Sequence, residues 1–240
     1  QNHGGDVSWV GHPLIDKFAD YSPALAKQDA RHQLGLEPTD CVVTLLPASR
    51  QQELAYVLPI MFKAAQQLQL QLPQLKFLVP LARDTFRKPL EDALQEYGLQ
   101  GRVIPREKQT LAISAADLAI SKSGTANLEI ALMEVPQVVM YRLNRITAWL
   151  AEFVLKFSVT YVSPVNLVNM EPIVPEFIQW EATPDAISQV ALNLLNNPDQ
   201  RQKMLDGYRT MRQQLGTLGV CDRAANEILD LAIQKAAAHA

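Results

Sequence analysis

The sequence has few cysteines and histidines, and their positions exclude several kinds of site. Its two cysteines, Cys41 and Cys221, lie far apart, and neither the cysteines nor the four histidines have the spacing of metal ligands. A zinc site is therefore not expected. Cys41 opens an apolar segment and Cys221 lies in a helical pattern, so we expect buried or half-buried free thiols in a reducing compartment.

Long apolar runs and concentrated positive charge are also absent. No apolar run approaches the roughly 18 residues that a membrane span needs, and the first residues, QNHGGDVSW, resemble neither a signal peptide nor a natural start. We therefore expect a cytoplasmic protein whose natural sequence begins upstream of Gln1. The net charge of −3 and the scattered lysines and arginines offer no basic surface, so no nucleic-acid partner is expected.

The sequence does contain short β-rich runs that alternate with longer helical patterns. The runs are almost continuously apolar, which is typical of strands buried on both faces of a parallel sheet. The expected strands are residues 41–46, 76–80, 102–104, 118–121, 137–141 and 159–162. About six βα units are too few for a TIM barrel. The pattern therefore predicts an α/β fold with a doubly wound, Rossmann-like parallel sheet.

We divide the chain into three parts. Residues 1–39 contain three prolines and few periodic apolar residues, and are expected to form an interdomain linker and a lead-in helix. Residues 40–182 form the predicted sheet domain. Residues 183–240 are almost wholly helical, with a new helix at Pro198, and are expected to pack on the same domain. Their apolar side chains also suit pairing between two copies. Helices are expected between the strands at 51–69, 85–97 and 125–134.

Ligands of open parallel sheets bind outside the carboxyl ends of the strands, and two of the corresponding loops are distinctive. The first is LLPASRQQE, residues 45–53. Its small residues Ala48 and Ser49 let a ligand approach the backbone, and the guanidinium of Arg50 suits phosphate oxygens. An ordinary helix start capped by Ser49, with Arg50 in solvent, explains the same pattern equally well.

The second distinctive loop is SKSGTANLE, residues 121–129. Gly124 permits close approach, and Ser123 and Thr125 supply hydroxyls at a helix start whose N–H groups attract anions. Glu129, one turn further on, suits two ribose hydroxyls, although simple capping of the helix also accounts for an acid there. Neither loop is GxGxxG or a P-loop. We interpret this turn as a site for the diphosphate and ribose of a nucleotide sugar.

Three other stretches are less specific. In residues 145–162 apolar side chains recur on one helical face, which indicates packing against the sheet or contact with a membrane surface, a lipid or a partner subunit. The Pro-rich residues 161–176 are expected to be a loop, in which Asn166 either contacts a ligand or holds its own turn. His12 is expected to be structural, because the sequence has no GxSxG nucleophile elbow.

Taken in order, these motifs resemble the lipid-A-disaccharide synthases, bacterial glycosyltransferases with the two-domain GT-B fold. The matching segments are VGHPLID at 10–16, LLPASR at 45–50, SKSGTANLE at 121–129, PQVVMYR at 136–142, YVSPVNLV at 161–168 and EATPDAI at 181–187. The resemblance implies transfer of a 2,3-diacylglucosamine unit, with inversion, from its UDP donor to the 6-hydroxyl of 2,3-diacylglucosamine 1-phosphate. The product is a β-1,6 disaccharide, and UDP leaves.

The resemblance also implies roles for parts of the chain. In such enzymes the C-terminal domain holds the UDP-sugar, and this chain resembles that domain. Nothing in it matches the N-terminal domain that carries the acceptor site and the general base, so we expect the chain alone to bind donor and to turn over negligibly. The implied donor contacts are Ser49, Arg50, Ser123, Gly124 and Thr125 at the diphosphate, Glu129 at the ribose, Tyr141 and Arg142 near the uracil, and Asn166 near the reacting end.

No metal or other cofactor is expected. A UDP leaving group needs positive potential, which Arg50 and a helix N-terminus supply, and the sequence has no DxD motif. Ala48 stands where the family usually has Gly, and the loop at 161–172 departs from the usual Pro-Asn-Leu pattern, which leaves donor selectivity open.

Two other functions remain as alternatives. One is another GT-B enzyme, either a different UDP-sugar transferase or a UDP-N-acetylglucosamine 2-epimerase. An epimerase is expected to have additional catalytic acids and histidines in this half, which the sequence lacks. The other is a module without catalysis that binds a nucleotide sugar or a partner.

Overall fold

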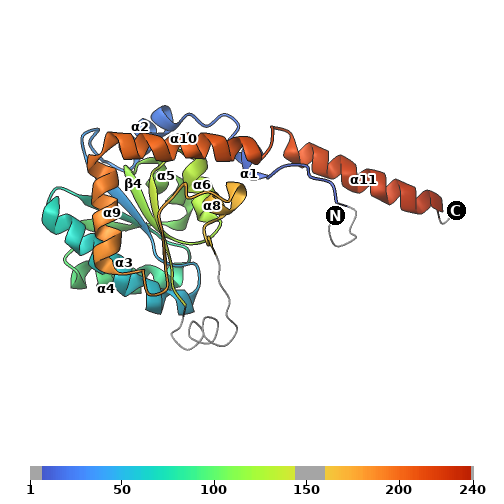
Figure 1. The fold of residues 1–240 in the computed structure, drawn as a ribbon. Helices are drawn as coiled ribbons and strands as arrows, with labels where there is room; N and C mark the ends of the chain where they lie inside the picture. Colours follow the sequence, from blue (N-terminus) through green and yellow to red (C-terminus); the bar gives the residue numbers. More distant parts are fainter. Residues whose placement is uncertain (1–6, 144–159, 239–240) are drawn as a thin grey trace.

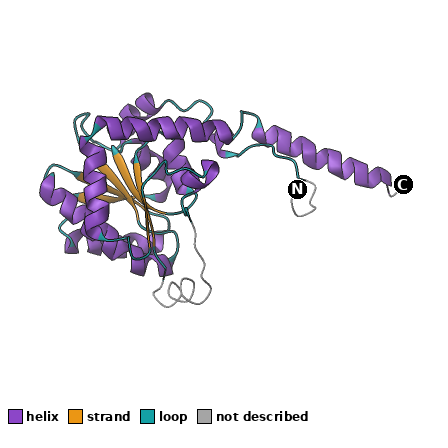
Figure 2. Ribbon diagram, in the orientation of Figure 1, coloured by secondary structure: helices purple, strands orange, loops and turns teal. Residues whose placement is uncertain are grey.

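A six-stranded parallel sheet lies at the centre of the protein (Figure 2). The computed structural model describes residues 7–143 and 160–238. The strands are β1 (Val42–Leu46), β2 (Lys76–Pro80), β3 (Gly101–Ile104), β4 (Leu118–Lys122), β5 (Gln137–Tyr141) and β6 (Glu176–Ile178). Their order is β3-β2-β1-β4-β5-β6, and every neighbouring pair is parallel. The order reverses between β1 and β4, as in a doubly wound sheet, so the predicted fold class is confirmed.

Five of the strands form where the apolar runs predicted them. Strands β1, β2, β4 and β5 are almost entirely buried, which explains why their sequences are continuously apolar. The prediction of a sixth strand at 159–162 is wrong in its described part, because residues 160–162 form no strand. The sixth strand is instead β6, a short, half-buried segment that pairs with β5. Edge position and partial burial remove the apolar run that marks the other strands.

Helices occupy both faces of the sheet (Figure 1). They are α1 (Leu14–Lys17), α2 (Pro23–Gln33), α3 (Gln51–Gln71), α4 (Arg87–Glu96), α5 (Gln109–Ser114), α6 (Ala126–Leu132), α8 (Pro164–Asn169), α9 (Pro184–Asn196), α10 (Pro198–Gln214) and α11 (Val220–Ala238), with short 3₁₀ turns at Asp84–Phe86 and Arg106–Lys108. The helix restart at Pro198 is confirmed. Most of the amphipathic stretch at 145–162 lies outside the described residues. In the part of the chain that is described, no helix is long and apolar enough to cross a membrane.

The expectation of a loop at 161–176 is wrong in part, because α8 forms there. Ser163 is its N-cap: the Ser163 hydroxyl accepts a hydrogen bond from the backbone N–H of Val165 at 3.3 Å. Pro164 occupies the first helical position, where its fixed φ and missing N–H are compatible with a helix. The prolines and polar residues of this segment therefore start a short helix instead of preventing one.

Alternate residues of β1 and β2 face two separate cores. Val43 and Leu45 of β1 belong to the main core, whereas Val42 and Leu78 belong to a second core with residues of α2 and α5. Between these strand residues, the Thr44 hydroxyl donates to the carbonyl of Ala112 in α5 at 2.7 Å. The sheet is thus covered on both faces, and its strand ends are left as the place where a ligand can enter.

The N-terminal segment is tied to the sheet domain at two places. In α2, the buried Arg31 donates to the carboxylate of Asp117 at 2.9 Å, just before β4. Near α1, the backbone N–H of His12 donates to the carbonyl of Leu215, and the His12 Nδ1 accepts from Leu14 at 3.2 Å. His12 therefore has structural contacts. The domain boundaries that we drew at 39/40 and 182/183 stay predictions.

The C-terminal helices lie in two different settings. Helices α9 and α10 pack against α3, α8 and each other, whereas α11 extends away from the sheet domain (Figure 1). The start of α11 is held by Asp16, whose carboxylate accepts from the backbone N–H groups of Gly219 at 2.7 Å and Cys221 at 2.8 Å. The hydrogen bond from Cys221 is the largest of the contacts that lower the pKa of Asp16. Cys221 itself is exposed, which corrects our expectation of a shielded thiol, and Cys41 is half-buried.

Candidate functional site

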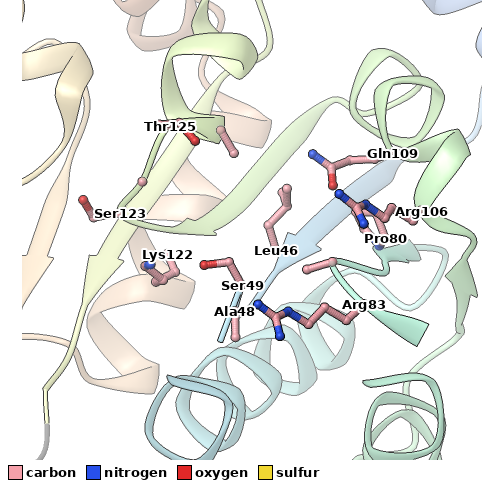
Figure 3. Close-up of a pocket in the computed structure, with 13 residues that line it drawn as sticks. Leu46, Ala48, Ser49, Pro80, Arg83, Arg106, Gln109, Lys122, Ser123 and Thr125 are labelled. Carbon is pink, nitrogen blue, oxygen red and sulfur yellow. The ribbon is translucent and has the colours of Figure 1, made fainter. Parts of the chain in front are cut away.

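A cleft of about 660 Å³ opens at the carboxyl ends of four strands (Figure 3). It lies at the switch point between β1 and β4, where ligands of doubly wound sheets bind. The lining residues come from the ends of the strands and the loops that follow them: Leu46, Ala48 and Ser49 at β1, Pro80, Ala82 and Arg83 at β2, Arg106 and Gln109 at β3, and Lys122, Ser123, Gly124, Thr125 and Ala126 at β4. The two loops that the sequence analysis identified therefore form adjacent walls of one cleft.

The structure brings four of the predicted site residues together in this lining, namely Ser49, Ser123, Gly124 and Thr125. Arg50 is next to Ser49 and exposed, but it is not part of the lining; it stands at the N-cap of α3. Its proposed contact with a diphosphate stays a prediction.

The loop after β4 is held in place by Asn127, which is completely buried. The Asn127 Oδ1 accepts from the backbone N–H of Gly124 at 2.7 Å, and its Nδ2 donates to the hydroxyl of Ser121 at 2.7 Å. Ser123 donates its own hydroxyl hydrogen to the carbonyl of Val162 at 2.6 Å. The Gly124 N–H and the Ser123 hydroxyl hydrogen already have partners in the protein. These two residues therefore shape the wall of the cleft, and hydrogen bonds to a bound anion have to come from other groups.

Two arginines that our sequence reasoning missed supply such donors. Arg83 follows β2 by three residues and Arg106 follows β3 by two, and both are exposed and line the cleft. Figure 3 shows them on the side opposite Ser123 and Thr125, with the Arg83 guanidinium directed towards Ser49. The sequence contained a signal for them, because both arginines come shortly after predicted strands whose carboxyl ends share one edge of the sheet.

Lys122 is a third cation in the lining, and it has a carboxylate partner. Its ammonium lies 2.9 Å from the Glu53 Oε1, and the two side chains are only 15% and 21% exposed. Glu53 also accepts hydrogen bonds from the start of α3, so it connects the loops after β1 and β4. Burial raises the pKa of Glu53, but the hydrogen bonds from Lys122 and Ser49 and the charge of Lys122 outweigh it and lower the pKa.

The other four predicted residues lie outside the lining of this cleft. Glu129 pairs with Lys17 at 3.0 Å. Tyr141 and Arg142 are half-buried at the end of β5, and Arg142 donates to the carbonyl of Ala182 at 3.4 Å. Their roles as ribose and uracil contacts stay predictions.

Asn166 is buried and makes several hydrogen bonds within its own segment. Its side-chain amide donates to the carbonyl of Val174 at 2.9 Å and to Glu176 at 2.7 Å, and its Oδ1 accepts from the N–H of Val174 at 2.9 Å. The geometry is that of the alternative in which Asn166 holds its own turn. It joins α8 to the start of β6, away from the lining of the cleft.

The charge of the cleft suits an anion. Arg83 and Arg106 contribute positive charge, the charge of Lys122 is offset by Glu53, and none of the residues that line the cleft is acidic. Within residues 7–143 and 160–238, no three His, Cys, Asp or Glu side chains gather in a way that would hold a metal ion. The arrangement can therefore bind a phosphate-bearing ligand through guanidinium and ammonium groups.

Known structures with the same arrangement of elements include sugar-nucleotide enzymes. WaaG, a glycosyltransferase involved in lipopolysaccharide biosynthesis, matches 90% of this chain and 54% of its own with a TM-score of 0.60 and 12% identity. A UDP-GlcNAc 2-epimerase from Neisseria meningitidis bound to UDP-GlcNAc matches 92% of this chain and 54% of its own with a TM-score of 0.56 and 17% identity. At such identities the likeness shows the fold alone.

Sequence comparison is more specific. The curated lipid-A-disaccharide synthase of Gloeothece citriformis is 53% identical over 227 residues, which are 95% of this chain and 58% of that protein. The one from Synechocystis is 45% identical over 97% of this chain and 58% of that protein. This chain thus spans somewhat more than half the length of these relatives. Residues 1–229 also match the family model described as lipid-A-disaccharide synthetase, and the chain belongs to that family.

Proposed function

We propose that this chain is the donor-binding half of a glycosyltransferase of lipid A biosynthesis, and that the cleft between β1 and β4 holds the diphosphate of a UDP-sugar. The reaction is transfer of 2,3-diacylglucosamine from UDP to the 6-hydroxyl of 2,3-diacylglucosamine 1-phosphate. This proposal rests on the family membership and on the cationic cleft at the switch point of the sheet.

The cationic lining is the observation that carries the proposal. A diphosphate carries at least two negative charges, and a UDP leaving group gains charge as the glycosidic bond breaks. Fixed cations beside it stabilise that charge in the transition state more than in the ground state. Arg83 and Arg106 on one side, and Lys122 with the loop around Gly124 on the other, surround a volume in which two phosphate groups fit.

The acceptor is held elsewhere. The curated relatives are longer than this chain, which spans 58% of their length. The acceptor site and the general base belong to the part of such proteins that has no counterpart here. Approach of donor and acceptor contributes much of the rate of a two-substrate transfer. The chain alone is therefore a binding protein for the donor and has negligible transferase activity.

Titration calorimetry with nucleotides tests the donor site. UDP should bind with saturation, and UMP should bind at least about tenfold more weakly, because removal of one phosphate removes charge-assisted hydrogen bonds worth about 1.5–3 kcal/mol each. CDP and GDP distinguish a base-selective site from a general diphosphate site. Absence of heat with millimolar UDP would contradict the proposal. Equal affinities for UDP and UMP would show that the cleft does not bind the diphosphate.

The cleft does not favour the alternative function, a UDP-N-acetylglucosamine 2-epimerase. Its lining, as far as the described residues go, includes neither a histidine nor a carboxylate that would move a proton on the sugar. The similarity to the epimerases concerns the fold.

The membrane contact and the dimer belong to the same proposal. The acylated substrates reside at a bilayer, so the protein works at the cytoplasmic face of a membrane.

Helix α11 carries exposed apolar side chains at Ile228, Leu229, Leu231 and Ile233. A second copy covers some of them in a homodimer, since several exposed apolar side chains on one helix are unfavourable in water.

Light scattering after size exclusion measures this association. Wild type should have about twice the mass of one chain, and a variant with Leu229→Ser and Ile233→Ser should approach the mass of one. Leu70→Ser on α3 is the matched control, because Leu70 is 78% exposed on another helix. A monomeric wild type at high protein concentration would contradict the dimer.

A further inference from the structure

Glu53 uses its two carboxylate oxygens for two different walls of the cleft. The Oε2 atom accepts from the backbone N–H of Ser49 at 3.1 Å, from the Ser49 hydroxyl at 3.2 Å and from the backbone N–H of Arg50 at 3.2 Å. The Oε1 atom accepts from the ammonium of Lys122 at 2.9 Å. One side chain therefore bridges the loop after β1 and the end of β4.

Helix capping alone does not account for this arrangement. An acid at the third position of a helix commonly accepts from the N-cap backbone, which is what Oε2 does at the start of α3. That contact leaves the second oxygen free to face solvent. Here Oε1 binds a lysine from a strand 69 residues further along the chain, and the pair is mostly shielded from water. The shielding makes the bridge stronger than an exposed ion pair.

We propose that Glu53 is a positioning residue of the donor site, which sets the spacing between Ser49 and Lys122 on adjacent walls of the cleft. The inference rests on the proposed function, because it assigns to this cleft the diphosphate of the donor. Glu53 does not line the cleft and is not itself a contact of the ligand. It acts by holding Ser49 and the Lys122 ammonium in fixed positions on adjacent walls of the cleft.

The replacement Glu53→Gln distinguishes a positioning role of Glu53 from a purely electrostatic one. A glutamine oxygen still accepts from Ser49 and Arg50, but the amide group that replaces Oε1 cannot accept from Lys122, so only the bridge is lost. The variant also removes one negative charge beside the anion site. A purely electrostatic role for Glu53 therefore predicts tighter UDP binding, whereas a positioning role predicts weaker binding by about tenfold, the loss of one partly shielded charged contact.

Lys122→Met completes a double-mutant cycle. If Glu53 acts by placing Lys122, the double variant should bind UDP about as well as Lys122→Met alone, because the second change removes nothing further. Glu53→Asp, whose shorter side chain keeps the charge but draws it back from Lys122, should lie between wild type and Glu53→Gln. Thermal unfolding of each variant reports whether it is folded.

Asp40→Asn is the matched control. Asp40 pairs with Lys76 at 2.7 Å at the opposite, amino-terminal end of β1 and β2, so its loss removes an ion pair between strands without touching the cleft. Its UDP affinity should stay within about twofold of wild type.

The titrations separate the inference from the function on which it rests. Wild type that fails to bind UDP refutes the proposed function. Wild type that binds UDP, together with Glu53→Gln that binds equally or more tightly, refutes the positioning role alone. Additive losses in the double variant refute it as well, because Lys122 would then act without Glu53. Weaker binding by Glu53→Gln, with no further loss in the double variant, is the expected result.

Discussion

Replacement of both Arg83 and Arg106 with alanine is expected to weaken UDP binding by about 100-fold, and each single replacement by about tenfold. Charge-assisted hydrogen bonds from guanidinium to phosphate contribute about 1.5–3 kcal/mol each, and about 1.4 kcal/mol corresponds to a factor of ten. Both arginines are exposed in the cleft, so we take the lower end of that range. Titration calorimetry measures the affinities.

Three comparisons make the arginine result specific. Arg87→Ala removes an exposed arginine at the start of α4 that pairs with Glu91, and it should leave UDP affinity unchanged. Arg106→Lys keeps the charge and loses the fork of donors, so it should recover part of the affinity. Added salt should weaken wild type more than the double variant. A double variant that binds UDP with an affinity within threefold of wild type would show that the two arginines are not part of the donor site.

Asn127→Ala is expected to lower the free energy of unfolding by about 2–4 kcal/mol, because it leaves several buried polar groups without partners. The Asn127 Oδ1 accepts from the Gly124 N–H at 2.7 Å. The Asn127 Nδ2 donates to the Ser121 hydroxyl at 2.7 Å and to the Gln137 Oε1 at 3.2 Å. In the same network, the Gln137 side chain donates to the backbone carbonyl of residue 127 at 3.0 Å. Urea denaturation followed by circular dichroism measures the change.

The folded fraction of this variant should also bind UDP more weakly, because the loop around Gly124 loses its anchor. Asn193→Ala is the control: Asn193 is exposed on α9, and its replacement should change the free energy of unfolding by at most about 0.5 kcal/mol. Asn127→Ala with the stability and UDP affinity of wild type would show that the buried network does not hold this wall of the cleft.

The buried parts of the fold could be predicted because burial leaves a clear pattern in the sequence. Strand β5 is apolar and almost wholly shielded, and it forms at the predicted residues. Strand β6 was missed because Glu176–Ile178 are half-buried at the sheet edge, and one of its residues, Glu176, accepts hydrogen bonds from Val162 and Ser163. Local sequence carries no sign of partners 13 and 14 residues away.

The site could be predicted in part for the same reason. The loops at Ser49 and Gly124 follow strands that were recognised, and parallel strands place their carboxyl ends along one edge. The bridge from Glu53 to Lys122 joins residues 69 positions apart, and only the register of β1 beside β4 makes it visible. Asn166 was expected in a loop, where it would contact a ligand or hold its own turn, but it lies in α8 and is buried, with a hydrogen bond to Glu176 of β6.

A crystal structure of the chain with UDP bound would show directly where the diphosphate lies. We expect both phosphates at the carboxyl ends of β1 and β4, with the guanidinium groups of Arg83 and Arg106 within hydrogen-bond distance and the Gly124 backbone beside them. A diphosphate bound instead in the hollow between β6, α9 and α10, where Glu171 and Lys203 lie, would contradict it.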